Sequence, residues 1–471
     1  MTRALAALLL FALPALAATK PATPKVPKER AVVTHETAVI GGQRIAYTTT
    51  AGTLLLYNAD HKAIASVFYI AYIKDGADPA SRPITFAYNG GPGFASALVD
   101  IGGFGPRRIE WPAPGEIGRE QPPYRLVNNP YSIFNATDLV YIDAVGTGYS
   151  RIVGAGEPKT FYGFTADGHA FAQFIRRYVA KNGRWNSPKF LLGESYGTTR
   201  NAVLADDLVA KGMYLNGVID CSTVKDFPTI NFSAGNDLPY ELYLPSYAAV
   251  AWYHHKLHPQ PASLPQLVRQ AEAFAGGPYA RALFLGSKLA AAQEQQIAAR
   301  LSQFTGIPVA LWLKAGLRMT LPVFRRRLLG PTGPMAGRYD ARFTALELQP
   351  LLPFQGQTAA GATTTAIWGA LTASFDQYLH RDLHYTSNRL YRQSSNSVFR
   401  KWNWTFHPPL QDLGAGVGTL AVMNVAPDLA RAMGNDPGMQ VMFNNGYYDM
   451  ATPFFATEYT VAHMGLPAKL A

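Results

Sequence analysis

The pattern of hydrophobic and polar positions divides the chain into a strand-rich beginning, an alternation of strands and helices, and a long helical stretch. Over residues 31–90, apolar runs are separated by turn residues. The Gly41-Gly42 pair between two of these runs predicts a β-hairpin, because glycine adopts the positive φ angles of tight turns. Apolar runs at 65–73 and 82–91 predict further strands, the second ending in a glycine-rich turn. The beginning of the chain is therefore predicted to be β-sheet.

Strands and helices alternate in the next part of the chain. Strand patterns at 137–150 and 188–197 each run into a glycine-containing turn, and a third strand pattern covers 215–222. Apolar residues recur at helical spacing over 166–183, and 198–212 continues as a second helix. Such alternation predicts βαβ units and a mostly parallel sheet, in which functional groups gather at the carboxyl ends of the strands.

The pattern becomes largely helical from about residue 226 to 424, and a strand followed by a loop returns at 438–455. We therefore predict an α/β fold with a mostly parallel sheet, helices on both faces, and a largely helical cap insertion. The sheet domain would comprise residues 31–225 and 425–471. Residues 226–424 would form the cap over the active-site end of the sheet.

The first residues have the pattern of a secretory signal peptide. Arg3 precedes an apolar run, and a small-residue cleavage site ends at Ala17, so residues 1–17 are expected to be removed. Residues 18–30 are rich in proline and lysine and predict a flexible linker. The single cysteine, Cys221, permits no intramolecular disulfide and is expected to be a buried, inert thiol. We expect a secreted or bacterial periplasmic protein, without stable membrane insertion once the signal is cleaved.

Composition narrows the class of protein. The chain has 471 residues, of which 48% are hydrophobic and 15% charged, which favours a packed core and excludes global disorder. The formal charge of +11 comes from scattered Lys and Arg without a recognition motif, so we predict a solvated basic surface and no nucleic-acid partner. His254 and His258 are four apart in a helical segment, but they lack a third ligand and the glutamate of a zinc motif. We therefore expect no metal.

Residues 193–197, GESYG, fit the pattern G-x-S-x-G. A strand precedes this motif and a helix follows it, which is the context in which such a turn lifts a serine hydroxyl above a sheet. Ser195 is therefore our candidate nucleophile, which requires a base to activate it. The turn at 88–96 also follows a strand, and its glycines let backbone N–H groups face a substrate oxyanion, with the Tyr196 amide as second donor. Taken alone, that turn could be an ordinary β-turn.

Five motifs in this order carry a family resemblance. They are NGGPG (89–93), NPYS (129–132), DAVGTGYS (143–150), GESYG (193–197) and GYYDMATPFF (446–455). The first four are similar to motifs of the serine carboxypeptidase family of α/β-hydrolases, and the last resembles the bacterial branch of that family. The resemblance covers roughly residues 80–225 and 438–467. It implies an α/β-hydrolase fold and a serine-type carboxypeptidase that acts on peptides with a free C-terminus, without metal or organic cofactor.

The resemblance also assigns roles to residues at the matching positions. Ser195 would be the nucleophile that forms an acyl-enzyme, and Asp449 the acid that orients a histidine. The amides of Gly91 and Tyr196 would form the oxyanion hole. Asn89, Gly90 and Glu194 would bind the C-terminal carboxylate of the peptide. A glutamate can donate a hydrogen bond to a carboxylate only when protonated, so we expect activity to be best at acidic pH.

The chain departs from the family pattern near residue 103. Gly103 stands where a second glutamate is expected, and Asp100 is nearby but off register. Arg107 or Arg108 could hold the carboxylate instead through a charge-assisted contact. The alternative is that both are surface arginines, or arginines at the edge of the core.

The histidine of the expected Ser…Asp…His order is not evident. Only His463 follows Asp449, and it does so after 14 residues. A crossover connection alone takes about 10 to 12 residues. Thr452-Pro453 is expected to begin a helix that places His463 in its last turn. We therefore expect that this chain lacks the final strand and histidine segment of its domain.

Two other functions stay open at this point. The chain could be another serine hydrolase or acyltransferase, because one fold supports many acyl transfers. It could also be a catalytically incomplete member that only binds peptides.

Overall fold

The computed structural model describes residues 25–111, 121–345, 361–407, 422–467, 469 and 470. The predicted signal peptide, residues 1–17, lies outside these ranges. Within the predicted linker, Glu29 accepts a hydrogen bond from the Leu55 amide and pairs with Arg177 and Lys181. The chain is thus attached to the sheet domain just before its first strand.

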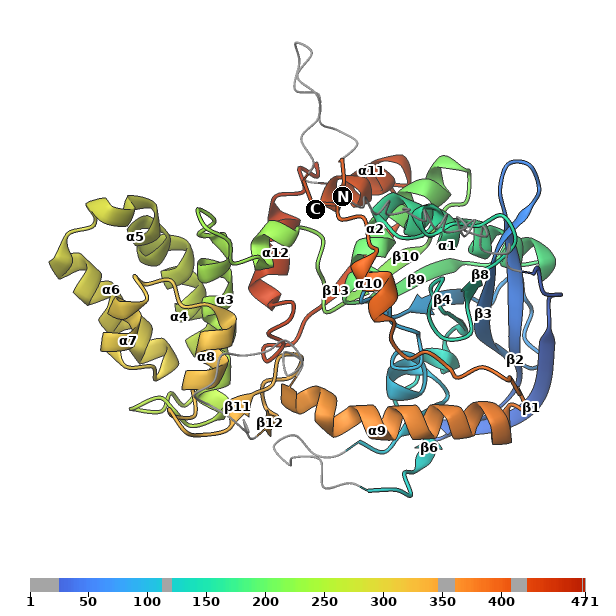
Figure 1. Ribbon diagram of the computed structural model, residues 1–471, viewed down its shortest axis with the longest axis horizontal. Helices are drawn as coiled ribbons and strands as arrows, with labels where there is room; N and C mark the ends of the chain where they lie inside the picture. Colours follow the sequence, from blue (N-terminus) through green and yellow to red (C-terminus); the bar gives the residue numbers. More distant parts are fainter. Residues whose placement is uncertain (1–24, 112–120, 346–360, 408–421, 468, 471) are drawn as a thin grey trace, which may run out of the picture.

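The amino-terminal half of the central sheet is antiparallel (Figure 1). Strands β1 (Ala31–Ile40), β2 (Gln43–Tyr57) and β3 (Ala63–Lys74) pair in sequence order, and the short β8 (Arg151–Ile152) joins β3. The hairpin predicted at Gly41-Gly42 is confirmed, and the two glycines have φ angles of +55° and +82°. These antiparallel strands extend the sheet beyond its parallel part.

The other half of the sheet is parallel. In sheet order its strands are β7 (Asp138–Ile142), β4 (Ile84–Tyr88), β9 (Lys189–Glu194), β10 (Gly217–Cys221) and β13 (Gln440–Asn444). Because the strands are parallel, their carboxyl ends lie at one edge of the sheet. The loops that follow β4, β9 and β13 carry the predicted site residues to that edge. The predicted fold class is confirmed, with an antiparallel addition that the alternating pattern did not indicate.

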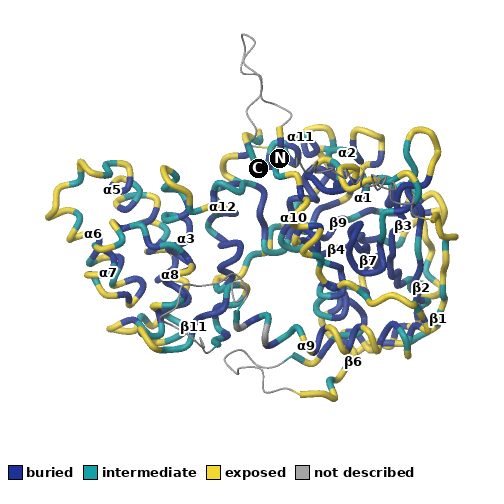
Figure 2. The backbone as a smooth tube through the Cα atoms, viewed as in Figure 1, coloured by how far each residue is buried: buried dark blue, intermediate teal, exposed yellow. Residues whose placement is uncertain are grey.

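Helices cover both faces of the sheet. Helices α1 (Phe164–Lys181), α2 (Tyr196–Ala210) and α11 (Ala426–Asn435) share one hydrophobic core with the first face. Helix α9 (Gly361–Gln377) lies along the other face, where its residue Phe375 packs in a second core. Alternate residues of β3 divide between them, Phe68 facing α9 and Tyr69 facing α1. The central strands are accordingly dark blue, that is buried, in Figure 2.

The chain between β10 and β13 carries the inserted helices. The first of these form a lobe with its own hydrophobic core, on the left of Figure 1. They are α3 (Leu238–Tyr253), α4 (Leu264–Phe274), α5 (Ala280–Leu285), α6 (Ala291–Thr305), α7 (Val309–Lys314) and α8 (Leu321–Arg327). The later part, with α9 and α10 (Asn396–Arg400), returns to the sheet, and its residues Val398 and Trp402 belong to the sheet core. The insertion is therefore part lobe and part cover of the sheet.

Short strand pairs and one further helix accompany these larger elements. Two small antiparallel pairs are β5 (Arg107–Ile109) with β6 (Leu126–Asn128), and β11 (Met335–Ala336) with β12 (Thr344–Ala345). Helix α12 (Phe454–Ala462) follows β13 and packs against α3. The carboxyl-terminal helix therefore joins the sheet domain to the helical lobe.

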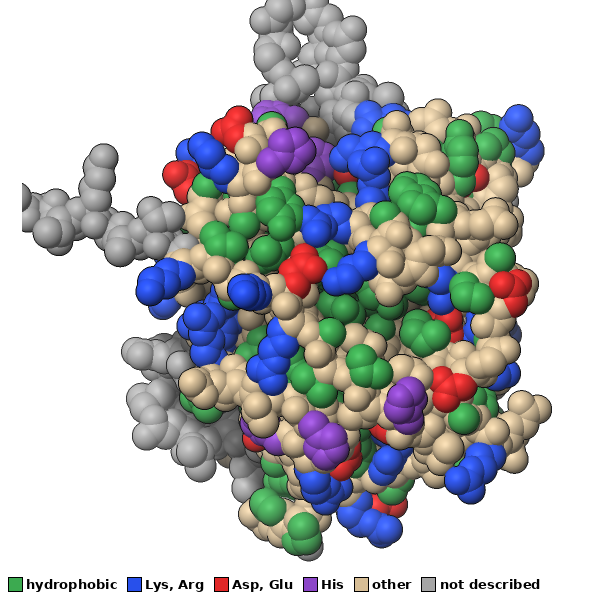
Figure 3. Space-filling model, turned by 90° about the vertical axis from the view of Figure 1, so that its right-hand side faces the viewer, with side chains coloured by type: hydrophobic (Ala, Val, Ile, Leu, Met, Phe, Trp, Pro, Cys, Tyr) green, Lys and Arg blue, Asp and Glu red, His purple; other side chains and the backbone are tan. Residues whose placement is uncertain are grey.

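Two surface properties bear on the expected surroundings of the protein. In the ranges described, no helix combines the length and apolar character that a membrane span requires. On the face seen in Figure 3, Lys and Arg side chains are spread among uncharged and acidic ones. The positive charge is thus not confined to one patch on that face.

A buried arginine joins α1, α2 and the end of β4. Arg200 of α2 is 1% exposed, and its Nε donates to Asp167 Oδ2 of α1 at 2.7 Å. Its Nη1 donates to the carbonyl oxygen of Asn89 at 2.8 Å. The guanidinium also lies 4.1 Å from the centre of the Phe171 ring. A charge buried so completely is tolerated only while it is paired and hydrogen-bonded.

We expect Arg200→Ala to lower the free energy of unfolding by about 3–5 kcal/mol, because it leaves the Asp167 carboxylate buried without its partner. Urea denaturation measures this change. The control is Lys211→Ala, which removes the partner of Asp207 from an exposed pair at the end of the same helix. That change should cost less than about 1 kcal/mol. Equal stability of the two variants would contradict the role assigned to Arg200.

Candidate active site

Ser195 occupies a tight turn between β9 and α2. Its φ and ψ angles are +56° and −126°, a conformation that non-glycine residues rarely adopt. The Ser195 amide donates to the Cys221 carbonyl oxygen at 2.9 Å, and the Thr198 amide donates to the Ser195 carbonyl oxygen at 2.8 Å. A Cβ at Gly193 would lie 2.3 Å from the Gly197 oxygen, so the turn needs glycine there. The structure therefore has the strand–turn–helix geometry that presents a serine hydroxyl above a sheet.

Cys221 lies beside this turn at the end of β10. Its thiol is partly buried, and burial raises its pKa to about 12, so the thiol stays protonated at neutral pH. It thus has the chemical character expected of an inert thiol.

The glycine-rich loop after β4 lies directly against the serine turn. A Cβ at Gly90 would lie 2.3 Å from the Tyr196 nitrogen and 2.6 Å from the Gly197 nitrogen. Gly91 has a φ angle of +115°, in the region that favours glycine. The Tyr196 amide is among the first amides of α2, which have no acceptor within the helix. The backbone of this loop and an available N–H group of the turn therefore meet beside Ser195.

Asn89 and Glu194 form a polar pair next to Ser195. The Asn89 Nδ2 donates to Glu194 Oε2 at 2.5 Å, and the Gly90 amide also hydrogen-bonds this carboxyl. Burial and, after it, the nearby Asp449 carboxyl raise the pKa of Glu194 to about 8, while the hydrogen bond from the Gly90 amide opposes the shift. A substantial fraction of Glu194 is therefore protonated at neutral pH, so it can donate a hydrogen bond.

Asp449 lies in the loop after β13 and is 9% exposed. Its Oδ1 accepts from the amides of Ala451 at 2.8 Å and Thr452 at 3.1 Å, and its Oδ2 accepts from the Thr452 hydroxyl at 2.8 Å. Burial raises the pKa of Asp449, and the hydrogen bonds from Thr452, Ser222 and Ala451 oppose that shift. The electrostatic effect of Asp449 on Glu194 indicates that the end of β9 and the loop after β13 bring these two carboxyls near each other.

No histidine in the described ranges hydrogen-bonds to Asp449. His463 directly follows the last residue of α12 rather than lying in its last turn, and it is exposed. Its Nδ1 lies 2.7 Å from the Tyr459 oxygen, and its ring stacks on that of Tyr459. His463 acts electrostatically on Asp226, whose pKa is raised by burial to about 6 while His463 opposes the shift.

The expectation that His254 and His258 share a helix is wrong. Helix α3 ends at Tyr253, and His255 has a φ angle of +53°, which takes the chain out of the helix. His254 Nε2 lies 2.8 Å from the Ala341 oxygen. Within the described ranges, no three or more His, Cys, Asp or Glu side chains lie together as metal ligands would.

The region of the expected second glutamate has other contacts. A Cβ at Gly103 would meet only the Leu98 oxygen, at 3.6 Å, so the space there does not require glycine. Arg107 donates to the Leu126 oxygen at 3.1 Å, and Arg108 lies 5.8 Å from the centre of the Tyr131 ring. The two arginine side chains therefore contact β6 and the loop that follows it.

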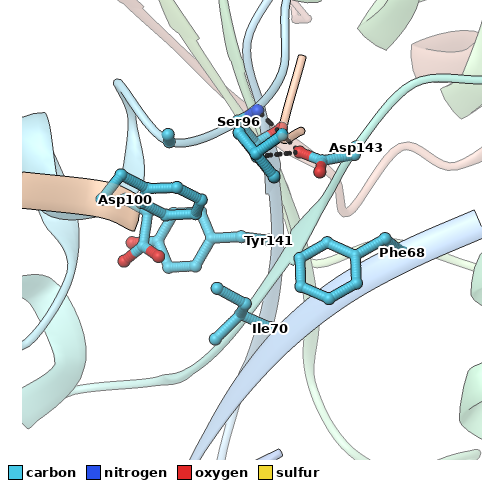
Figure 4. A pocket seen from close by; sticks show the side chains of 9 residues that line it. Phe68, Ile70, Ser96, Asp100, Tyr141 and Asp143 are labelled. Carbon is cyan, nitrogen blue, oxygen red and sulfur yellow. Dashed lines mark hydrogen bonds between the residues drawn. The ribbon is translucent and has the colours of Figure 1, made fainter. Parts of the chain in front are cut away.

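Two buried carboxyls lie behind the glycine-rich loop (Figure 4). Asp143, which follows β7, accepts hydrogen bonds from the Ser96 amide and the Tyr391 hydroxyl, both at 2.9 Å. The Ser96 hydroxyl accepts in turn from the Asn89 amide at 3.3 Å. Asp100 is bound by the Tyr72 hydroxyl at 3.0 Å, and burial raises its pKa. Sequence reasoning missed the anchoring position of Asp143, although its place at a strand end was a signal.

The sheet order, the serine turn after β9 and the acid after β13 define the class of protein as an α/β-hydrolase. Among solved structures, the chain is similar to Kex1(Δ)p, a prohormone-processing carboxypeptidase from Saccharomyces cerevisiae. The TM-score is 0.52 at 15% identity, over 89% of this chain and 77% of that one. It also matches a proline iminopeptidase from Mycobacterium smegmatis, with a TM-score of 0.30 and 11% identity, over 88% of this chain and 96% of that one.

A separate comparison finds a similarity to a protein family. The model of the serine carboxypeptidase family matches residues 44–217. This segment includes the glycine-rich loop, the pair Asn89 and Glu194, and the Ser195 turn. Over these residues the chain is similar to the serine carboxypeptidase family.

The raised pKa of Glu194 predicts a pH-dependent stability. The pKa is about 8 in the folded chain against an ordinary value of 4.5, so the folded state holds a proton that the unfolded state releases. This contribution to stability is present at low pH and is lost as the pH rises through that window.

We expect Glu194→Gln to remove this contribution, because the amide does not titrate. The free energy of unfolding of the variant minus that of the wild type should rise by more than about 1.4 kcal/mol, the value of one pKa unit, between about pH 5 and about pH 8. Urea denaturation at both pH values provides the measurement. Exposed Glu110→Gln is the control and should leave the pH dependence as in the wild type. A Glu194→Gln difference that does not change with pH would refute the assignment.

Proposed function

We propose that this chain is an exported serine-type carboxypeptidase that releases C-terminal residues from peptides. One observation carries the proposal: the Glu194 that pairs with Asn89 directly precedes Ser195 in the chain. A group that binds a free carboxylate so near a nucleophile selects the last peptide bond of a substrate. The family supports peptides as the substrate class. Export is inferred from the signal-like pattern of residues 1–17.

The proposed reaction is acyl transfer through Ser195. The Ser195 Oγ attacks the carbonyl carbon of the last peptide bond, and its proton passes to a general base. The carbonyl oxygen becomes an oxyanion that accepts hydrogen bonds from the Gly91 and Tyr196 amides. The C–N bond then breaks, and the departing amine takes the proton. Water hydrolyses the acyl-enzyme by the same steps and releases the shortened peptide.

The carboxylate of the departing residue would be held by Asn89, Gly90 and Glu194. Protonated Glu194 donates a hydrogen bond to this carboxylate, whereas ionised Glu194 repels it. The burial of Glu194 and its proximity to Asp449 both favour the protonated form, which supports this role. In the same proposal Asp449 orients the general base. We do not assign the role of this base to His463.

Two alternatives remain as proposals. The fold also suits another serine hydrolase or an acyltransferase. A catalytically incomplete peptide-binding member is favoured by the partners of Asp449, which in the described ranges are backbone amides and hydroxyl groups rather than an imidazole. The two predictions below separate these alternatives.

We expect a fluorophosphonate probe to label the purified chain at Ser195 and not the Ser195→Ala variant. The full chain should also hydrolyse a blocked peptide that ends in a free carboxylate faster than the same peptide with a C-terminal amide. Ser195→Ala should lower kcat by about 10⁴-fold or more. Labelling with equal hydrolysis of both peptides indicates another serine hydrolase. Peptide binding without labelling indicates the incomplete member.

The second prediction concerns pH and needs no turnover. In the Ser195→Ala background, a peptide with a free carboxylate should bind more weakly as the pH rises through about 8, because Glu194 becomes ionised. Isothermal titration calorimetry measures the dissociation constant. The amidated peptide is the control, since it has no carboxylate to be repelled. A dissociation constant for the free-carboxylate peptide that stays constant across this pH range would overturn the role of Glu194.

A further inference from the structure

A basic hollow lies on the surface beside the loops of the candidate site. Arg151, Arg389, Leu390 and Arg392 line this open hollow, which has a volume of about 570 Å³. Arg151 lies on β8, just after the loop that follows β7. The other three residues lie on the segment 389–395 between α9 and α10, which we call the strap.

The strap is hydrogen-bonded to both loops that border the candidate site. Arg392 exchanges two backbone hydrogen bonds with Gly148, of 2.8 and 3.2 Å. Further along, the Ser395 amide donates to the Gly93 oxygen at 2.8 Å, and the Ala95 amide donates to the Gln393 oxygen at 2.9 Å. Three residues of extended chain span at most about 10 Å, so Arg392 lies within that distance of Ser395. The basic hollow is therefore close to the glycine-rich loop that would hold the oxyanion.

The arginines of the hollow lack a counter-charge at the surface. Arg389 and Arg392 are exposed, and neither forms an ion pair with an acidic side chain in the described part of the chain. Arg151 is held by its own loop, since its Nη1 donates to the oxygens of Gly148 at 2.8 Å and Ser150 at 2.7 Å. Asp143, the acid whose charge acts on Arg151, is buried and accepts hydrogen bonds from Ser96 and Tyr391.

The free energy of this arrangement favours an added anion. Burial, followed by repulsion from Arg392 and Arg389, lowers the pKa of Arg151 to about 10, while Asp143 and Tyr162 oppose the shift. The Tyr162 hydroxyl is close enough to Arg392 and Arg151 for both charges to act on it. Like charges held together repel, and an anion placed among them offsets that repulsion. A guanidinium group also binds a carboxylate through two parallel hydrogen bonds.

We propose that the basic hollow binds acidic side chains of a peptide substrate, a few residues from the peptide bond that Ser195 attacks. This assignment rests on the proposed function, because it takes the substrate to be a peptide that passes the glycine-rich loop. An extended peptide advances about 3.3 Å per residue, so a short acidic segment spans the distance between the loop and the strap. Leu390, which is 89% exposed, offers an apolar surface to the aliphatic stems of such side chains. The chain would therefore prefer peptides with Asp or Glu shortly before their C-terminus.

The test is a binding comparison in the full chain carrying Ser195→Ala, so that no peptide is consumed. The probes are four acetylated hexapeptides with identical last residues. Two begin with Asp-Glu-Asp and two with the uncharged Asn-Gln-Asn, and each sequence is made with a free carboxylate and with a C-terminal amide. Each peptide is titrated into three proteins. The parent carries Ser195→Ala alone, the strap variant adds Arg389→Gln and Arg392→Gln, and the control variant adds Arg281→Gln and Arg327→Gln instead. The control removes the same charge from exposed positions on α5 and α8.

The parent should bind the acidic peptides about tenfold more tightly than the uncharged ones at low ionic strength. That ratio should fall below about threefold in the strap variant and stay unchanged in the control, and added salt should reduce it in the parent. Equal binding of acidic and uncharged peptides by the parent overturns the proposal. So does a preference that survives in the strap variant, or the absence of measurable binding by every peptide. The comparison of free-carboxylate peptides with amidated peptides tests the proposed function separately. A preference for acidic peptides without a preference for the free carboxylate would contradict the proposed function but not the role of the basic hollow.

Discussion

The buried guanidinium of Arg200 is the constraint on which the candidate site depends. It binds Asp167 of α1 and the carbonyl oxygen of Asn89, and it projects from the second turn of α2, the helix that Ser195 precedes. The residue after Asn89 is Gly90, whose Cα faces the Tyr196 amide so closely that no side chain fits between them. A movement of α2 relative to β4 would therefore displace the serine turn and the glycine-rich loop together. The pairing of one buried charge thus fixes the relative positions of Ser195 and the glycine-rich loop.

A second buried pair holds the other side of the serine turn. Lys225 donates to Asp220 at 2.7 Å and to the Thr198 oxygen at 2.8 Å, which attaches the end of β10 to the first turn of α2. The turn therefore lies between two ion pairs that burial makes costly to break. The positive φ angle of Ser195 is strained for a non-glycine residue. Such a conformation persists only where contacts with the surrounding structure hold the backbone in place. These pairs supply such surroundings.

Sequence patterns predicted what depends on local structure. The Gly41-Gly42 hairpin, the strand before Ser195 and the helix after it follow from turn chemistry and periodicity. The Arg200 contact with Asn89 joins residues 111 positions apart, and the Asp143 contact with Tyr391 spans 248. A single sequence carries no record of such pairings, so these anchors and the strap were not predictable. The helix end at Tyr253 was not predictable from Pro259, because a proline restricts only the residue directly before it, here His258.

The hydrogen bonds of Asp449 indicate which of its present partners a histidine base would replace. An ionised carboxylate offers about four acceptor sites. The Ala451 and Thr452 amides and the Thr452 hydroxyl take three of them, and the Ser222 hydroxyl also bonds this carboxyl. The amides are fixed by the loop, whereas the hydroxyls can rotate, so an imidazole N–H would take the place of a hydroxyl. The loop and Ser222 therefore orient Asp449, and a base would bind to a carboxylate whose position is already set.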